Sequence, residues 1–247
     1  MQLPETVRSM MRPAAVAELG GFRPPEDPAA SWAGAVRVGL PGEGWPSQDG
    51  ESMLALLQVN VSELPFMPQV LEGIRVVTLF VGPRNLPVQQ PNGTNWALRA
   101  YRDASSLVEL AEPSPARAGD PKARKGETGA YSCLPVRWRG VEDYPSRDDW
   151  PFDRLDEYDA LEEELGEAMP RPHDGIKVGG WPTTVQHEVD WGRLSTTGQP
   201  RPADIDFVLQ VDSEDRIGFS AGFGGVLYVG RSVVDDEETW HIDWQSM

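Results

Sequence analysis

Hydrophobic residues in this chain gather into short, nearly continuous runs. Four of them matter most for the fold: residues 56–60 (LLQVN), 77–82 (VTLFVG), 208–212 (VLQVD) and 225–230 (GVLYVG). A short apolar run with β-branched residues near its end is typical of a strand that is covered on both faces. We therefore expect four buried strands, two in each half of the chain.

The runs of the first half recur in the same order in the second half. RVGLP begins at Arg37 and precedes the first two runs, and KVGGWP begins at Lys177 and precedes the last two. Aligning them places Val38 with Val178 and Gly82 with Gly230. Ordered self-similarity of this kind predicts two diverged copies of one structural unit.

Each predicted copy carries a glutamine inside an apolar strand, Gln58 in the first and Gln210 in the second. A buried amide that lacks hydrogen-bond partners is costly, so we expect each glutamine to bond to the backbone of a neighbouring strand or turn. Because the position is matched in both copies, a structural role is favoured. The alternative is a cleft between the copies, where both glutamines meet Asn60 and Asp212.

The sequence predicts an α+β protein that is mostly β and forms one compact domain with a few peripheral helices. Gly and Pro together number 48 of 247 residues, which favours short elements joined by turns. The expected segments are an N-terminal helix with a lead-in (1–35, helix within 5–19), a first β-rich repeat (36–110), a mobile Pro-rich and charged insertion (111–129), and an acidic helix with the second repeat (130–247).

The acidic helix is predicted over residues 153–169, where apolar residues recur at helical spacing. Its carboxylates, Glu162 and Glu163 among them, form either a solvated face or a docking face for a basic partner. Near the C-terminus, Trp240, Ile242 and Trp244 alternate with His241 and Asp243, which predicts a strand with its apolar side chains inward.

The order of these motifs resembles the YwqG-like family of bacterial proteins of unknown function. The resemblance is carried by a glycine-proline turn, a Trp-Pro at Trp45, the QVN and QVD strands, an ELP segment at Glu63, and the LFVG and LYVG strands, within residues 36–82 and 175–244. It implies a duplicated β-rich fold and brings no catalytic residues. The chain departs from the pattern where VGLP replaces VGGWP and in its long proline-rich middle.

The net charge of −17 disfavours nucleic acid and anionic membrane surfaces as partners, and it would speed encounter with a basic protein. Acidity can also be explained by solubility alone.

No apolar stretch is long enough to span a membrane or to act as a secretion signal, so we expect a cytoplasmic protein. The single cysteine, Cys133, excludes an internal disulfide, and its apolar neighbours predict a buried, inert thiol.

The sequence lacks the common motifs of catalytic and nucleotide-binding sites. GFGG at residues 222–225 lacks dinucleotide-loop spacing and fits a hairpin turn, and no P-loop, nucleophile-elbow or zincin motif occurs. His187, beside Glu188 and near Asp190, is the only histidine in a setting that could help to hold a metal. We therefore assign no catalytic residue, no metal site and no cofactor.

Two hypotheses for the function remain open. The first is a non-enzymatic acidic binding protein, of the immunity or antitoxin kind, that occludes a basic partner such as a toxin domain. The second is an enzyme or small-molecule binder with a cleft between the two repeats. Trp181, beside the second glycine turn, is either a recognition anchor or a core residue, and its place in a repeated motif favours the core. The oligomeric state cannot be predicted.

Overall fold

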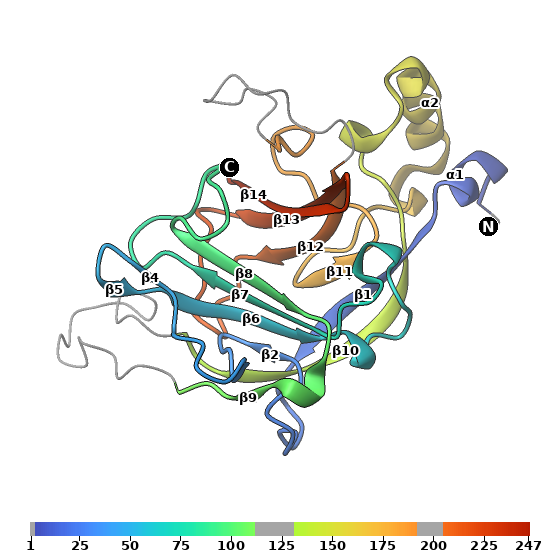
Figure 1. Cartoon of the computed structure of the whole chain (residues 1–247). Helices are drawn as coiled ribbons and strands as arrows, with labels where there is room; N and C mark the ends of the chain where they lie inside the picture. The colour runs from blue at the N-terminus through green and yellow to red at the C-terminus, as the bar shows by residue number, and fades with distance from the viewer. Residues whose placement is uncertain (1–2, 112–130, 192–204) are drawn as a thin grey trace.

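The protein is mostly β in the computed structural model, which describes residues 3–111, 131–191 and 205–247 (Figure 1). One sheet has ten strands, and two further sheets have two strands each. The ten strands are β14 (Glu237–Gln245), β13 (Val226–Val234), β12 (Asp206–Asp212), β11 (Lys177–Gly179), β1 (Arg12–Leu19), β10 (Leu134–Asp143), β2 (Trp32–Ala33), β6 (Leu54–Asn60), β7 (Val76–Val81) and β8 (Trp96–Tyr101), in sheet order.

The small sheets and the helices lie around this sheet. Strands β3 (Val38–Gly39) and β9 (Val108–Glu109) pair with each other, as do β4 (Ser47–Gln48) and β5 (Glu51–Ser52). The helices are α1 (Glu5–Ser9) and α2 (Leu155–Leu165), with 3₁₀ turns η1 (Val61–Glu63), η2 (Gln69–Leu71), η3 (Ala104–Ser106), η4 (Arg147–Asp149), η5 (Phe152–Arg154) and η6 (Gly166–Ala168). The predicted insertion at 111–129 lies, apart from Ala111, outside the described residues.

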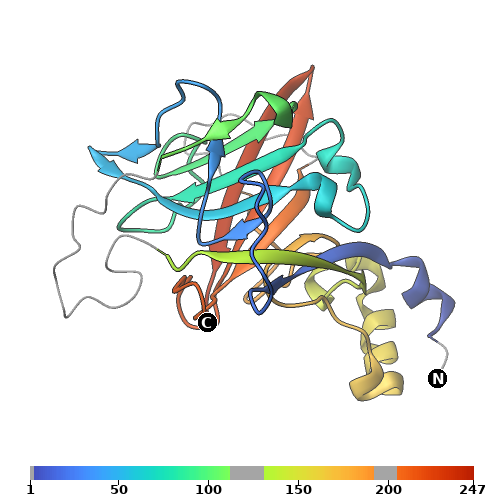
Figure 2. The same cartoon turned by 90° about the horizontal axis from the view of Figure 1, so that it is seen from below.

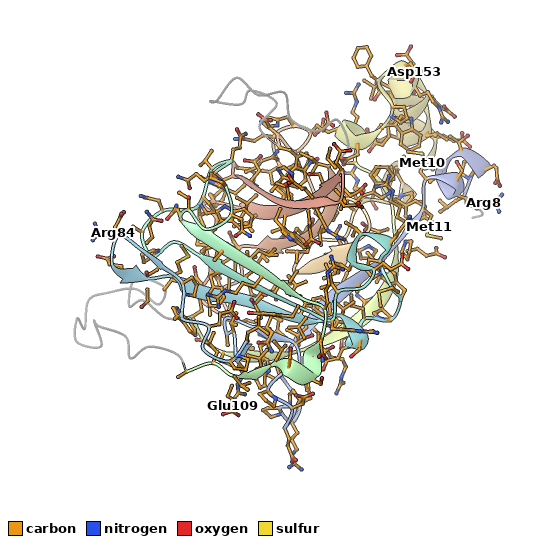
Figure 3. All side chains as sticks on the ribbon, in the orientation of Figure 1. Arg8, Met10, Met11, Arg84, Glu109 and Asp153 are labelled. Carbon is orange, nitrogen blue, oxygen red and sulfur yellow. The ribbon has the colours of Figure 1, made fainter. Side chains whose placement is uncertain are left out.

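The large sheet consists of a central antiparallel pair, β1 and β10, with four strands on either side. We call β2, β6, β7 and β8 the first arm, and β11, β12, β13 and β14 the second arm. The sheet curls so that the arms face each other across one core, to which Leu56 and Leu79 contribute from the first arm and Leu209 and Leu227 from the second (Figures 2 and 3). Contacts at the rim, such as the 2.9 Å ion pair between Arg102 and Glu238, join the arms directly.

The expected N-terminal helix over residues 5–19 is wrong beyond its first turns. Helix α1 ends at Ser9, and β1 follows from Arg12 to Leu19. Pro13 cannot donate the backbone hydrogen bond that a helix interior requires, which stops the helix there. Strand β1 instead lies between β10 and β11, where Ala14 and Ala15 are fully buried.

The two arms place their glutamines in the same position. Gln58 on β6 lies opposite Trp32 on β2 and Thr78 on β7. Gln210 on β12 lies opposite Lys177 on β11 and Tyr228 on β13. Each ladder also has a bulge, between Ala55 and Leu57 in the first arm and between Phe207 and Leu209 in the second, shortly before the glutamine.

These registers correct part of the sequence alignment. Val38 and Gly39 of RVGLP form β3, away from the large sheet, whereas Val178 lies in β11. The strand that takes the place of β11 in the first arm is β2, and Gly34 and Gly179, which follow corresponding residues, have φ of 72° and 73°. Gly82 is likewise out of step with Gly230, since Thr78 corresponds to Tyr228. Descent of the arms from one duplicated unit stays a prediction.

Helix α2 and strand β14 lie where the sequence predicts them. Tyr158 and Leu165 of α2 are buried in a separate cluster with Trp150. In β14, Trp240 and Ile242 face inward as expected. His241 and Asp243 are buried as well, which simple alternation does not predict. The reason is that residues 185–191 cover the other face of the second arm.

Candidate functional site

The side chain of Gln58 is fully buried and holds two loops of the first arm together. Its Oε1 accepts hydrogen bonds from the backbone N–H of Arg37 (2.8 Å) and Val38 (3.2 Å). Its Nε2 donates to the carbonyl oxygens of Pro28 (2.8 Å) and Ala30 (2.6 Å). All four partners are backbone groups, so the predicted bonding of the buried amide to nearby backbone is confirmed.

Gln210 forms the equivalent contacts in the second arm, with side chains added. Its Oε1 accepts from the backbone N–H of Thr183 (2.9 Å), and its Nε2 lies 3.4 Å from the carbonyl oxygen of Gly175. The same Nε2 donates to Thr183 Oγ1 and to Asp212 Oδ1, both at 3.0 Å. Burial raises the pKa of Asp212 to about 6.

The predicted convergence of these residues in a cleft does not occur. Gln58 and Gln210 are each enclosed by loops of their own arm, and Asn60 caps the η1 turn by accepting from Ser62 N–H. Only Gln210 and Asp212 are in contact. The matched glutamines therefore act as structural clamps.

Beneath Gln210 lies a buried ion pair that sequence reasoning missed. Asp143 and Lys177 are both fully buried, with 3.0 Å between Asp143 Oδ2 and Lys177 Nζ. Asp143 also accepts from the backbone N–H of His173 and Trp181, both at 2.7 Å. Burial lowers the pKa of Lys177, and the nearby carboxylate of Asp143 partly offsets this shift. In the sequence, the signal that could have indicated this ion pair is the lysine within the apolar KVG strand.

Trp181 is half-buried and belongs to none of the hydrophobic clusters among the described residues, so the favoured core reading does not fit. Its Nε1 donates to the carbonyl oxygen of Met10 at 2.9 Å. The guanidinium of Arg12 lies over its ring, 3.4 Å from the centroid. The indole is therefore fixed at the surface, between two depressions.

The first depression, which we call the acidic hollow, lies between Trp181 and the segment leading into α2, with a volume of about 520 Å³. It is lined by Arg147, Asp148, Asp149, Trp150, Pro151, Phe152, Leu155, Trp181 and Glu188. Arg147 is held by Asp159, at 2.8 Å from Nε to Oδ1. Burial raises the pKa of Asp149 to about 6. Phe152 is 90% exposed.

Helix α2 extends the acidic surface beyond the hollow. Residues 147–171 contain ten carboxylates and three arginines. Glu162 is paired with Arg171 at 2.9 Å, whereas Glu163 and Glu164 are exposed. His187 directly precedes Glu188 of the hollow but does not line it. Its Nδ1 lies 2.7 Å from the Glu188 carbonyl oxygen, and its backbone carbonyl accepts from Gln245. Figure 3 shows Asp153 at the outer end of this surface.

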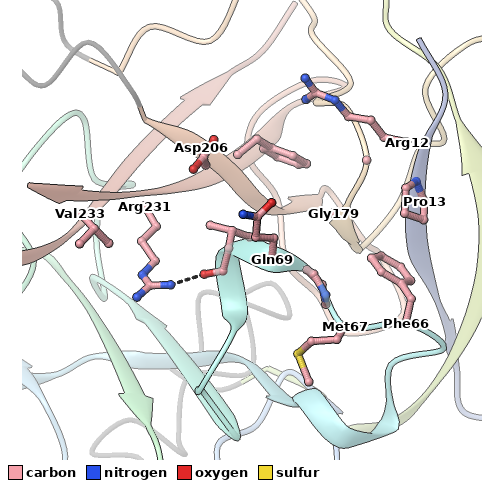
Figure 4. Close-up of a pocket in the computed structure, with 13 residues that line it drawn as sticks. Arg12, Pro13, Phe66, Met67, Gln69, Gly179, Asp206, Arg231 and Val233 are labelled. Atoms are coloured by element: carbon pink, nitrogen blue, oxygen red, sulfur yellow. Dashed lines mark hydrogen bonds between the residues drawn. The ribbon is translucent and has the colours of Figure 1, made fainter. Parts of the chain in front are cut away.

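The second depression, the inter-arm cavity, has a volume of about 840 Å³ (Figure 4). Its lining comes from β1, from the segment around η2 of the first arm, and from β11, β12 and β13 of the second: Arg12, Pro13, Phe66, Met67, Pro68, Gln69, Val70, Gly179, Gly180, Asp206, Phe207, Arg231 and Val233. A cavity between the arms thus exists, but Gln58, Asn60, Gln210 and Asp212 do not line it.

The remaining chemical candidates are simple to place. Cys133 is exposed, contrary to the buried thiol expected from its neighbours, because it precedes β10 and stands outside the strand ladder. Within residues 3–111, 131–191 and 205–247, no three His, Cys, Asp or Glu side chains are grouped so that they could hold a metal ion. No described helix is long and apolar enough to cross a membrane.

Neither a protein-family model nor a curated protein matches this chain. Membership of the YwqG-like family therefore stays a prediction that rests on the short motifs alone.

Proposed function

We propose that the protein is a non-catalytic binding protein that takes a basic partner protein on the acidic hollow and the adjoining face of α2. The proposal rests on Phe152, a phenylalanine that is 90% exposed. It lies on the rim of a depression with three carboxylates, Asp148, Asp149 and Glu188. An exposed aromatic residue next to a depression is characteristic of a docking surface.

Charge and apolar contact would have separate roles in this binding. The carboxylates of α2 steer a basic partner during encounter, which raises the association rate and makes it depend on salt. Phe152 and the edge of Trp181 supply desolvated contact area, which slows dissociation. A toxin domain with clustered Lys and Arg residues has the matching chemistry, and its occlusion would be the work of an immunity-like protein.

The charge test compares two triple variants with the same change in net charge. E163K/E164K/E167K alters exposed carboxylates on and beside α2, and it avoids Glu162 because of its ion pair with Arg171. E109K/D215K/E237K alters exposed carboxylates elsewhere. The partner is first captured from the native organism with the wild-type chain and identified.

Association rates are then measured by surface plasmon resonance at about 20 mM and about 150 mM salt. The α2 variant is expected to associate about ten times more slowly at low salt, and the control variant much less so. An association rate of the wild type that is the same at both salt concentrations would rule out the proposal.

The aromatic test compares F152A with F223A, since Phe223 is also exposed, at 80%, but lies in the turn before β13. F152A should raise the dissociation rate about tenfold or more, whereas F223A should leave it unchanged. Equal effects of the two variants would show that Phe152 is not part of the interface.

A further inference from the structure

The inter-arm cavity has the size and composition of a small-molecule site. Its volume of about 840 Å³ lies within the range of ligand pockets. Segments far apart in the chain meet there, because β1 contributes Arg12, the η2 segment contributes Gln69, and β12 contributes Asp206 (Figure 4).

Arg12 is positioned to bind an anion. Its Cζ lies 3.4 Å from the centroid of the Trp181 ring, so the indole covers one side of the guanidinium. A guanidinium that stacks on an aromatic ring can still donate hydrogen bonds in its own plane. Among the described residues, no carboxylate or carbonyl accepts a hydrogen bond from Arg12 or pairs with it. A planar guanidinium held in this way matches the two oxygens of a carboxylate.

The other arginine in the cavity already has partners. Arg231 donates to the carbonyl oxygen of Val70 and, at 2.8 Å, to Glu238. It therefore holds the η2 segment against β13 and shapes the wall. Arg12 is left as the cation that can take a ligand.

Asp206 gives the cavity a second, opposite charge. Burial lowers the pKa of Arg12, and the charges of Asp149 and Asp206 partly offset this shift. The described structure nevertheless contains no ion pair between Arg12 and Asp206. A ligand with an anionic and a cationic group would satisfy both at once. Phe66, Met67 and Phe207 supply an apolar wall beside them.

We infer that the inter-arm cavity binds small amphoteric carboxylates with an apolar body, of the class of apolar amino acids and short peptides. The carboxylate pairs with Arg12, the ammonium group pairs with Asp206, and the side chain packs on Phe66 and Met67. A phosphate dianion fits less well, because Asp206 and the net charge of −17 both repel it. This site does not depend on the proposed protein partner.

The test uses isothermal titration calorimetry of the full chain with four probes that share a phenyl group. L-phenylalanine carries both charges, N-acetyl-L-phenylalanine lacks the ammonium group, L-phenylalanine amide lacks the carboxylate, and phenyl phosphate replaces the carboxylate with a phosphate. L-phenylalanine should bind with a dissociation constant on the order of 0.1 mM, and each of the other probes at least about tenfold more weakly.

Three variants locate the site. R12Q should weaken L-phenylalanine binding at least about tenfold. R137Q is the matched control, since Arg137 also lies over an aromatic ring, that of Phe22, but is not among the residues that line the cavity, and it should bind as the wild type does. D206N should reduce the preference for L-phenylalanine over N-acetyl-L-phenylalanine.

Thermal melting of each variant checks that it folds. Absence of L-phenylalanine binding by the wild type at about 5 mM, or unchanged binding by a folded R12Q, would overturn the site. Tighter binding of phenyl phosphate than of L-phenylalanine would overturn the assignment to amphoteric carboxylates.

Discussion

The two arms of the sheet use the same glutamine clamp in different surroundings. In the first arm the described partners of Gln58 are all backbone groups, and its neighbour across the ladder is Trp32. In the second arm Gln210 shares its amide with Thr183 and Asp212, and its neighbour is Lys177, which pairs with Asp143. The position of the clamp is thus common to both arms, while the groups around it are free to differ.

The first arm thus surrounds its glutamine with backbone groups, and the second arm adds polar side chains around its own. Both depressions of the candidate site are bordered by Trp181 or Arg12, and the backbone N–H of Trp181 is held by Asp143. Buried polar groups of β10 and the second arm therefore support the surface where we place binding, and the first arm contributes to it through the η2 segment.

The largest expected effect comes from breaking the buried ion pair. D143A leaves Lys177 buried without its carboxylate and removes an acceptor from two backbone N–H groups, which should lower the free energy of unfolding by about 5 kcal/mol. D143L/K177M should recover much of that loss. Urea denaturation measures both variants, and a loss below about 1 kcal/mol for D143A would show that the pair is not needed.

Replacing each glutamine by leucine compares the clamps directly. Q58L leaves four backbone groups without their partner and should cost about 4 kcal/mol. Q210L should cost about 2 kcal/mol, because the partners lost include side chains that can reorient. Chemical denaturation decides the order, and a larger loss for Q210L would contradict the comparison.

The glycines after β2 and in β11 give a third comparison. A Cβ at Gly34 would lie 2.2 Å from the backbone oxygen of Ser132, whereas one at Gly179 would lie 3.0 Å from the ring of Phe66 and 3.2 Å from the backbone oxygen of Pro13. Both positions have positive φ. G34A should therefore lower the free energy of unfolding by about 3 kcal/mol and G179A by about 1 kcal/mol. Equal losses would mean that only φ matters.

A pH dependence of stability is expected from the second arm. Burial raises the pKa of Asp243 to about 6, so the folded state holds this proton more tightly than the unfolded state does. The corresponding stability is present at low pH and is lost as the pH rises from about 4 through about 6, by up to about 3 kcal/mol.

D243N removes this titration. Asp149 and Asp212 titrate in the same range and the same direction, so the informative quantity is the difference between wild type and variant. Urea denaturation at several pH values should show the difference changing between about pH 4 and pH 6. Parallel curves would contradict the assignment.

Local pattern was enough to predict the strands that are covered on both faces. β6, β7, β12 and β13 coincide with apolar runs, and the cost of burying an amide was enough to predict what Gln58 bonds to. The same reasoning failed for β1, whose RPAAVAEL sequence has little β propensity and becomes a strand because β10 and β11 pair with it.

Contacts between distant segments were the part that sequence could not supply. Asp143 and Lys177 come from strands separated by α2, and Arg12 and Trp181 are far apart in the sequence. The charged residues among them are ordinary solvated side chains when considered alone, and Trp181 alone fits a core position. The curled sheet brings them together, so the acidic hollow and the inter-arm cavity could not be predicted from sequence motifs.

The ion pair between Arg102 and Glu238 has a consequence for solubility. Arg102 directly follows β8 and Glu238 belongs to β14, so the contact lies between the two edge strands of the sheet. Unpaired edges are templates on which further chains can add as strands, the first step towards fibrils. Because this contact joins the two edges, we expect it to hinder the addition of further chains. R102A should aggregate at a lower temperature than the wild type in light scattering, even though the pair is partly exposed and adds little to folding stability.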